Sequence, residues 1–353
     1  MIRISPKKQA VQRQKKQKIM EEIEEKNDNK TVEYIETGVT YAAIDIGSNA
    51  VRLLIKRLNN PDTLPVFNKV LLLRVPLRLG FDVFSSGEIS ERKHKDLIRL
   101  MKAYKHLMKI YDVADYRACA TSAIRDAANG SKIIKSVEKA SGIRIEIIDG
   151  QEEARMIYNN HIETMKGHKG NFMYVDVGGG STEINLLTDG VLVCSRSYNI
   201  GTVRILNGAV LESEWNRLRR DMKDLAASYP DINLIGSGGN INRLFKMAEH
   251  RDKRYPRMTV ASLKALYEKL QPLSVEERME EYNMKQDRAD VIVPAGNIFL
   301  TIAEITRSTY IYVPVIGLSD GIIDELYTKH KSGLALQGRM KETDKSDLKK
   351  DKG

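Results

Sequence analysis

The 353-residue chain has little cysteine, proline or aromatic content. It contains two cysteines, nine prolines and one tryptophan, and aromatic residues make up 6% of it. Two cysteines cannot form the disulfide framework of a small secreted domain, so we expect Cys119 and Cys194 to be free thiols in a reducing cytoplasm. No run of about 18 apolar residues occurs, so no membrane helix is predicted. The basic N-terminus also lacks the apolar core of a secretory signal.

Several motifs of other chemistries are absent from the sequence. Without GxxxxGK[ST] the sequence does not favour a Walker-type NTPase, and none of the six histidines forms an HExxH pair. No GxSxG elbow supports a serine hydrolase. The net charge is +10, but half of this surplus lies in residues 1–40 and 331–353. The remaining charge is compatible with a polyanionic substrate, whereas no basic and aromatic stripe favours nucleic acid as a partner.

The length favours two domains, and the composition separates them from two charged ends. We expect residues 1–36 to form a disordered N-terminal arm and residues 331–353 a polar tail. Strands are predicted at 41–46, 51–58, 66–75, 114–120, 144–148, 171–177, 182–188, 191–198, 232–236 and 309–316. Helices are predicted at 90–111, 122–140, 151–166, 212–228, 239–250, 260–270, 289–307 and 319–330. In each half the hairpin strands come first, which predicts two related α/β lobes around a cleft.

One short pattern occurs twice. Residues 41–56 read YAAIDIGSNAVRLLIK and residues 172–187 read FMYVDVGGGSTEINLL. Each is an apolar run, then Asp-x-Gly and small residues, then a second strand-like run, which predicts a tight hairpin whose backbone N–H groups face an anion. Two such hairpins suit a phosphate chain held from both sides. In the first we assign phosphate binding to Asp45, Gly47, Ser48 and Asn49, although a plain hairpin turn also explains them.

The second hairpin carries three consecutive glycines. We assign phosphate binding to Gly178, Gly179, Gly180 and Ser181. Three consecutive glycines lose much conformational entropy on folding, which is explained if the backbone must lie against a ligand. A flexible loop is the alternative. Asp176 and Glu183 flank the turn, and carboxylate oxygens of this kind suit Mg²⁺ together with waters and substrate phosphate.

An acidic helix start follows at 149–155, DGQEEAR. Acidic residues in a first helical turn are ordinary partners of the helix dipole, which accounts for Glu152. Glu153 instead lies beside the apolar stripe of the helix, while Glu152 shares the polar side with Arg155. We therefore expect Glu153 to point into the cleft and to act as a general base for water.

Further candidates lie at strand ends. Arg125 lies near a helix N-terminus, where phosphate binding is favoured, although a surface arginine explains it equally well. A third Gly-rich strand exit contains Gly236, Ser237 and Gly238, a weak signal when taken alone. Additional arginines that we expect near the substrate are Arg52, Arg204 and Arg243.

Taken together, the segments AIDIGSNAVRLLI, ATSAIRDA, IIDGQEEARMIY, YVDVGGGSTEI, IGSGGNI and ADVIVPAG resemble the exopolyphosphatase and guanosine pentaphosphate phosphatase family. The resemblance implies an α/β fold of two ribonuclease-H-like lobes, belonging to the actin-like, sugar kinase and Hsp70 ATPase superfold, with an interdomain cleft. The chain resembles the short two-domain form. The first lobe would be 37–154 plus a returning helix at 319–330, and the second 155–318.

The resemblance also implies residue roles. Glu153 matches the catalytic glutamate, Asp176 and Glu183 match the metal-binding pair, and Arg125 matches the arginine of the Thr-x-x-x-Arg stretch. The glycines and serines of the two hairpins match the phosphate-binding backbone. Two departures affect substrate details: Asp149 stands where the family usually has serine, and the loop from Gly236 to Asn240 lacks the usual threonine.

The function expected from these features is a Mg²⁺-dependent exopolyphosphatase that releases orthophosphate from inorganic polyphosphate. The alternative with the same chemistry is removal of the 5′ γ-phosphate of guanosine pentaphosphate. An ATP-dependent kinase of the same fold and a non-catalytic polyphosphate or alarmone sensor are further alternatives, which the EEAR helix start and the retained carboxylates disfavour. No membrane partner is expected, and a homodimer stays open.

Overall fold

The computed structural model describes residues 38–59, 66–165, 169–252, 256–314 and 317–329. Residues 39–353 cluster into one unit and residues 1–38 into another, and the fold is that of the larger unit. The predicted N-terminal arm (1–36) and polar tail (331–353) lie outside the described residues. None of the helices in the described part of the chain combines the length and apolar character needed to cross a bilayer.

The first sheet has five strands in the order β3-β2-β1-β4-β5. Its strands are β1 (Gly38–Ile46), β2 (Val51–Asn59), β3 (Val66–Val75), β4 (Val113–Ala120) and β5 (Glu146–Ile147). The pairs β1–β4 and β4–β5 are parallel, whereas β2–β3 is antiparallel. Because β1 lies in the middle of the sheet, its side chains are buried on both faces, as its nearly continuous apolar run requires.

The second sheet repeats this arrangement and extends it. Its order is β10-β11-β12-β9-β6-β7-β8, so that β8-β7-β6-β9-β12 follows the same succession as β3-β2-β1-β4-β5. Its strands are β6 (Asn171–Val177), β7 (Thr182–Thr188), β8 (Val191–Tyr198), β9 (Asn233–Ser237), β10 (Arg251–Asp252), β11 (Arg257–Thr259) and β12 (Tyr310–Tyr312). The repeat gives β1 and β6 equivalent places, which confirms the prediction of two related α/β lobes.

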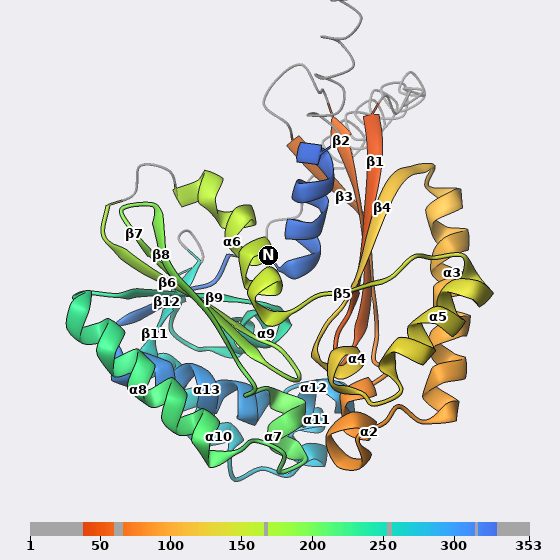
Figure 1. Cartoon of the computed structure of the whole chain (residues 1–353). Helices are drawn as coiled ribbons and strands as arrows, with labels where there is room; N and C mark the ends of the chain where they lie inside the picture. The colour runs from red at the N-terminus through yellow and green to blue at the C-terminus, as the bar shows by residue number, and fades with distance from the viewer. Residues whose placement is uncertain (1–37, 60–65, 166–168, 253–255, 315–316, 330–353) are drawn as a thin grey trace, which may run out of the picture. The chain divides into compact units, whose positions relative to one another are not determined.

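Helices cover both faces of the first sheet (Figure 1). The helices of this half are α2 (Leu79–Ser86), α3 (Glu91–Ile110), α4 (Ser122–Asp126), α5 (Gly130–Ser141) and α6 (Gly150–Met165). One apolar core joins β1 to α3 and α5, and another joins the opposite face of β1 to α6 and to the last helix, residues 318–329. We call residues 318–329 the C-terminal helix. It packs on the first sheet although it follows the second one in sequence.

The second sheet packs against helices that follow it in sequence. They are α7 (Thr202–Leu206), α8 (Glu212–Ser228), α9 (Gly239–Met247), α10 (Val260–Leu270), α11 (Val275–Glu281), α12 (Gln286–Ala289) and α13 (Ile292–Ile305). The largest core combines β6 residues such as Val175 with Leu218 of α8 and Phe299 of α13. Helix α6 also contacts β7 and β8, so it lies against strands of both sheets.

One predicted helix is wrong. The span 122–140 divides into α4 and α5, because Ala127 has an extended backbone (φ −71°, ψ 127°). The loop between them is held by Asn129, whose side chain accepts from the N–H of Ile89 at 3.0 Å and donates to its carbonyl at 2.8 Å. This tertiary contact outweighs the local helix propensity.

Other boundaries differ by a few residues. The sequence also missed the short helices α2, α7 and α11 and the short strands β10 and β11. Cys119 is buried and Cys194 partly buried, and both are free thiols, as expected.

Candidate active site

The first predicted phosphate hairpin joins β1 to β2. The turn is closed by the N–H of Gly47, which donates to the carbonyl of Ala50 at 3.1 Å. Asp45, only 3% exposed, lies in β1 just before the turn. Its Oδ2 accepts from Arg52 Nη1 of the neighbouring strand at 2.5 Å. The buried aspartate is therefore already paired with a cation of its own sheet.

The second predicted hairpin joins β6 to β7 and repeats this geometry. The N–H of Gly178 donates to the carbonyl of Ser181 at 3.0 Å. A Cβ added to Gly179 would lie 3.0 Å from Ser48 Cβ and 3.1 Å from the Asn49 nitrogen of the first hairpin. The two glycine turns thus touch at their tips. Their aspartates, Asp45 and Asp176, are 131 positions apart in the sequence.

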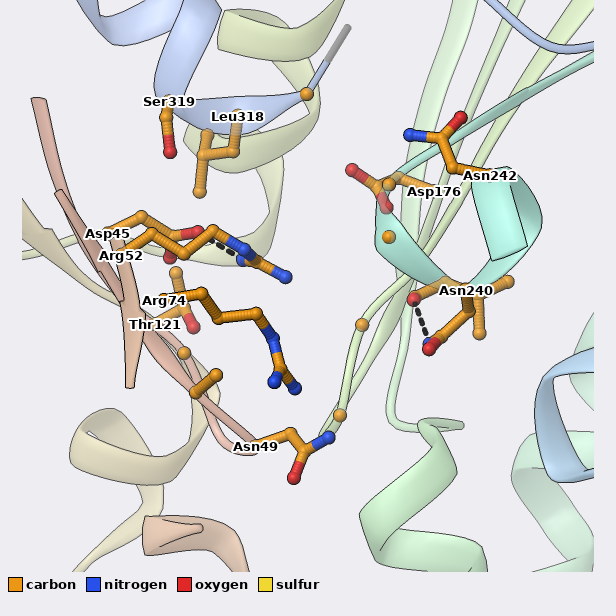
Figure 2. A pocket seen from close by; sticks show the side chains of 18 of the residues that line it. Asp45, Asn49, Arg52, Arg74, Thr121, Asp176, Asn240, Asn242, Leu318 and Ser319 are labelled. Carbon is orange, nitrogen blue, oxygen red and sulfur yellow. Dashed lines mark hydrogen bonds and ion pairs between the residues drawn. The ribbon is translucent and has the colours of Figure 1, made fainter. Parts of the chain in front are cut away.

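The two hairpins and the start of α6 border one cleft of about 410 Å³. Figure 2 shows Asp45, Asn49 and Arg52 on one side of it and Asp176 on the other. The predicted site residues that line it are Asp45, Gly47, Ser48, Asn49, Glu153, Asp176, Gly178, Gly179, Ser181, Glu183 and Gly238. The arrangement brings together the three segments that sequence reasoning had expected to meet.

Three acidic side chains enter the cleft from separate elements. Glu153 comes from the first turn of α6, Asp176 from β6, and Glu183 from β7, where it pairs in register with Asp176. The pKa of Glu153 is raised well above its ordinary value, first by burial and then by the charges of Glu183, Asp45 and Asp176, while Arg125 acts in the opposite direction. Its Oε2 is buried and accepts no hydrogen bond from another described residue.

The same environment acts on the two other carboxylates. Burial raises the pKa of Asp176 to about 6, against the effect of the Arg52 charge. Burial also raises the pKa of Glu183 to about 7, although Ser197 Oγ donates to its Oε1 at 2.9 Å. Carboxylates with raised pKa values in one cleft are typical of functional sites, because a cation or a proton is needed to stabilise them together.

Cationic side chains also line the cleft, and sequence reasoning missed most of them. Arg74 lies at the end of β3, and Arg288 lies in α12. Burial, and after it the charges of Arg74 and Arg52, lower the pKa of Arg288 to about 9. Two lysines, Lys69 and Lys246, border the same cleft. The only sequence signal for these residues was a cation within or next to an apolar run, as in LLLRV and DRADVIV.

Four predicted site residues do not line this cleft. A Cβ on Gly180 would lie 2.2 Å from Ser122 Oγ, and one on Gly236 would lie 2.7 Å from Ile241, so both glycines permit close packing. Ser237 lies opposite Asp176 in the parallel pair β6–β9. Arg125 donates from Nη1 to the carbonyl of Ile148 at 2.9 Å and lines a separate depression, so it acts on the cleft through its charge.

The remaining candidate arginines have different surroundings. Arg204 does not line the cleft. Its Nε donates to the carbonyl of Gly180 at 2.9 Å, which supports the second hairpin from behind. Arg243 lines the cleft and donates to the carbonyl of Asn283 at 3.1 Å. Arg52 lines it as the partner of Asp45.

The repeated sheets and the glycine hairpins that meet beside buried carboxylates are typical of a two-lobed α/β protein that binds phosphate. A sequence profile of the Ppx/GppA phosphatase family matches residues 61–330. The chain belongs to the Ppx/GppA phosphatase family, whose members are phosphoanhydride hydrolases.

Three curated relatives illustrate the range of this family. Exopolyphosphatase 1 of Mycobacterium bovis is 26% identical over 71% of this chain and 77% of its own length. A guanosine-5′-triphosphate,3′-diphosphate pyrophosphatase of Aliivibrio fischeri is 25% identical over 81% of this chain and 60% of its own. A bifunctional 3-dehydroquinate synthase/phosphatase of Fusobacterium nucleatum is 30% identical over 56% of this chain, but the match spans only 31% of that protein.

Two solved structures support the fold. The crystal structure of the Aquifex aeolicus family member has a TM-score of 0.66 at 26% identity and covers 83% of this chain and 99% of that one. An exopolyphosphatase from Cytophaga hutchinsonii has a TM-score of 0.71 at 20% identity, covering 81% and 97%. Each of the two matches covers more than four fifths of this chain.

Proposed function

We propose that this protein is an exopolyphosphatase that hydrolyses the terminal phosphoanhydride bond of inorganic polyphosphate. One observation carries the proposal: two phosphate-type hairpins touch at their tips, with Glu153 beside them in the same cleft. Cationic side chains in the lining of the cleft, Arg74 and Arg288 among them, suit a substrate that carries many negative charges.

In the proposed reaction the chain binds the terminal phosphate through backbone N–H groups of the two hairpins. These groups stabilise the charge that develops on the transferred phosphoryl oxygens. Glu153 holds the attacking water through its unpartnered Oε2 and takes its proton. The new bond joins the water oxygen to the terminal phosphorus, the bridging P–O bond breaks, and the electron pair leaves with the shortened chain.

Mg²⁺ is the cofactor we propose, and the donor set fits it. Asp176 and Glu183 provide carboxylate oxygens as metal ligands. Burial raises the pKa of both groups, and a bound cation would lower these pKa values again. Among the described residues no three acidic, His or Cys side chains are grouped to hold a metal alone. Mg²⁺ usually retains waters and shares substrate phosphates, so a pair of carboxylates is sufficient. When bound, it would neutralise charge on the phosphate oxygens.

Guanosine pentaphosphate is the second candidate substrate, since the relative from Aliivibrio fischeri is named for such a nucleotide. The bond broken would be the same. Phosphate release from polyphosphate and from guanosine pentaphosphate at matched concentrations, with and without Mg²⁺, separates the two. ATP-dependent phosphorylation of an acceptor would favour a kinase, and binding without turnover would favour a sensor.

The Glu153→Gln variant tests the role of the base. We expect phosphate release to fall by roughly 100-fold or more, with KM little changed, because an amide cannot take the proton of water. Glu212→Gln, on the exposed face of α8, serves as the matched control and keeps wild-type turnover. Near-normal phosphate release by Glu153→Gln would remove this residue as the base.

A further inference from the structure

A buried arginine lies outside the cleft and has no part in the mechanism above. Arg117 of β4 is only 9% exposed and binds three glutamates from three different elements. Nη2 donates at 2.8 Å to Glu146 of β5 and at 2.8 Å to Glu152 of α6. Nη1 donates at 2.7 Å to Glu325 of the C-terminal helix. Nε adds a further bond to Glu146 at 3.1 Å.

This cluster contains more negative than positive charge. One guanidinium meets three carboxylates, and the nearby Lys329 pairs with Glu325 at 3.2 Å. Burying the Arg117 guanidinium is costly, and apolar side chains often stabilise a fold as well or better. What a guanidinium provides is geometry, because its planar set of donors fixes several acceptors in direction as well as distance. The cluster therefore fixes the relative positions of β4, α6 and the C-terminal helix.

Glu152 connects this cluster to the cleft, because it immediately precedes Glu153. Successive residues of an α-helix are about 100° apart around its axis, so fixing Glu152 on one side determines the direction of Glu153 on the other. The first turn is also held by Asp149, whose Oδ1 accepts from the Glu152 N–H at 2.8 Å. From the second sheet, Asn185 donates to the carbonyl of Ala154 at 2.8 Å.

Glu325 connects the cluster to a further part of the cleft lining. The C-terminal helix begins with Leu318, Ser319 and Asp320, which line the cleft. It lies directly against α6, since a Cβ on Gly321 would be 2.3 Å from the carbonyl oxygen of Met156. A rotation of α6 about its axis would therefore strain both this backbone contact and the ion pairs of Arg117.

We propose that Arg117 is a positioning residue, which through Glu152 and Glu325 holds the first turn of α6 so that Glu153 faces the phosphate hairpins. The inference rests on the proposed function. Arg117 does not line the cleft, and its ion pairs involve neither glycine turn, so its effect should appear in the chemical step and not in substrate binding.

The test is Arg117→Met, a variant that keeps the apolar stem, compared with Arg117→Lys. We expect kcat on polyphosphate to fall by about 10- to 100-fold in Arg117→Met, because a small misplacement of a catalytic group has effects of this size. KM should change by less than about twofold, since the hairpins keep their positions. Arg117→Lys should recover part of the kcat, as it restores the charge and some of the hydrogen bonds.

The controls separate positioning from general stability. Arg99→Met removes an exposed ion pair with Asp96 and should leave kcat unchanged. Glu152→Gln should lower kcat less than Arg117→Met does, and the double variant should be no worse than Arg117→Met alone, because both act through one contact. Folded Arg117→Met with wild-type kcat, or additive effects in the double variant, would overturn the inference. If Arg117→Met does not fold, an unchanged kcat in Glu152→Gln decides against it.

A readout without turnover keeps this inference distinct from the proposed function. Amide hydrogen exchange at residues 151–154 should be at least about tenfold faster in Arg117→Met than in the wild type, because the first turn loses its anchor. If the wild-type protein releases no phosphate from any of the substrates, the proposed function fails, and the exchange result still reports on Arg117. Unchanged protection of this turn would show that Arg117 does not hold it.

Discussion

At the scale of single residues, Glu153, Asp176 and Glu183 determine the chemistry of the cleft. They lie in separate elements. The pKa of each carboxyl group is higher in this buried cluster than in water, because burial and mutual repulsion disfavour the charged forms. The folded protein therefore keeps their protons to higher pH than the unfolded chain does.

This behaviour predicts a pH dependence of stability in the metal-free protein. The free energy of unfolding should fall as pH rises from about 4 to about 7, since the unfolded state releases these protons first. Glu183→Gln should remove the contribution of Glu183 to this pH dependence. Its free energy of unfolding should be about 1–3 kcal/mol above that of the wild type at pH 8 and nearly equal to it at pH 4. Urea unfolding at several pH values in EDTA measures this. A variant that is less stable at pH 8 would contradict the prediction.

At the scale of elements, the second hairpin packs closely against the first half of the molecule at a glycine, Gly180. Sequence reasoning assigned Gly180 to phosphate binding, but its backbone packs against the first half, and a Cβ there would lie 2.2 Å from Ser122 Oγ and 2.8 Å from Phe84. The fold therefore uses part of the triple glycine for close packing between elements, and Gly178 and Gly179 are the members that line the cleft.

Gly180→Ala should consequently destabilise the protein. We expect a loss of about 1–3 kcal/mol, which is the usual cost of forcing extra atoms into a tightly packed contact. Thermal unfolding measures it. The control is Gly208→Asn, at φ +62° with nothing within 4 Å of an added Cβ, a conformation that asparagine tolerates. Equal melting temperatures for Gly180→Ala and the wild type would refute the packing role.

At the scale of the whole unit, ion pairs join the two lobes beside the cleft. Arg74 of β3 pairs with Asp287 of α12, and Arg78, just before α2, pairs with Asp290. Asn49 of the first hairpin adds a hydrogen bond from Nδ2 to the Asp287 carbonyl at 3.0 Å. These side chains are largely buried, so removing one partner leaves a poorly solvated charge.

Weakening these pairs should loosen the lobes. In the double variant Asp287→Asn and Asp290→Asn we expect a lower melting temperature and a broader distance distribution between spin labels at positions 102 and 223, because buried arginines lose their charged partners. Asp96→Asn, whose partner Arg99 is exposed, is the matched control. An unchanged distribution in the double variant would show that apolar packing and the hairpin contact are sufficient to hold the lobes.

Much of this fold could be predicted locally. The β1–β2 and β6–β7 hairpins follow from apolar runs that end in Asp-x-Gly, and the predicted strands 66–75, 171–177, 182–188 and 191–198 agree with the structure residue for residue. The helix break at Ala127 could not be predicted, because it depends on Asn129 reaching a loop 40 positions earlier. Helices such as α7 are too short to show a periodic pattern.

The sequence by itself determined the two glycine hairpins, the buried strands before them and the acidic start of α6, because each is specified by neighbouring residues. Only the tertiary structure decided which groups share a space with them. Arg74 meets Asp287 across 213 positions, and Arg117 meets Glu325 across 208. Such partners depend on how the sheets and the C-terminal helix pack, and no local pattern records that packing.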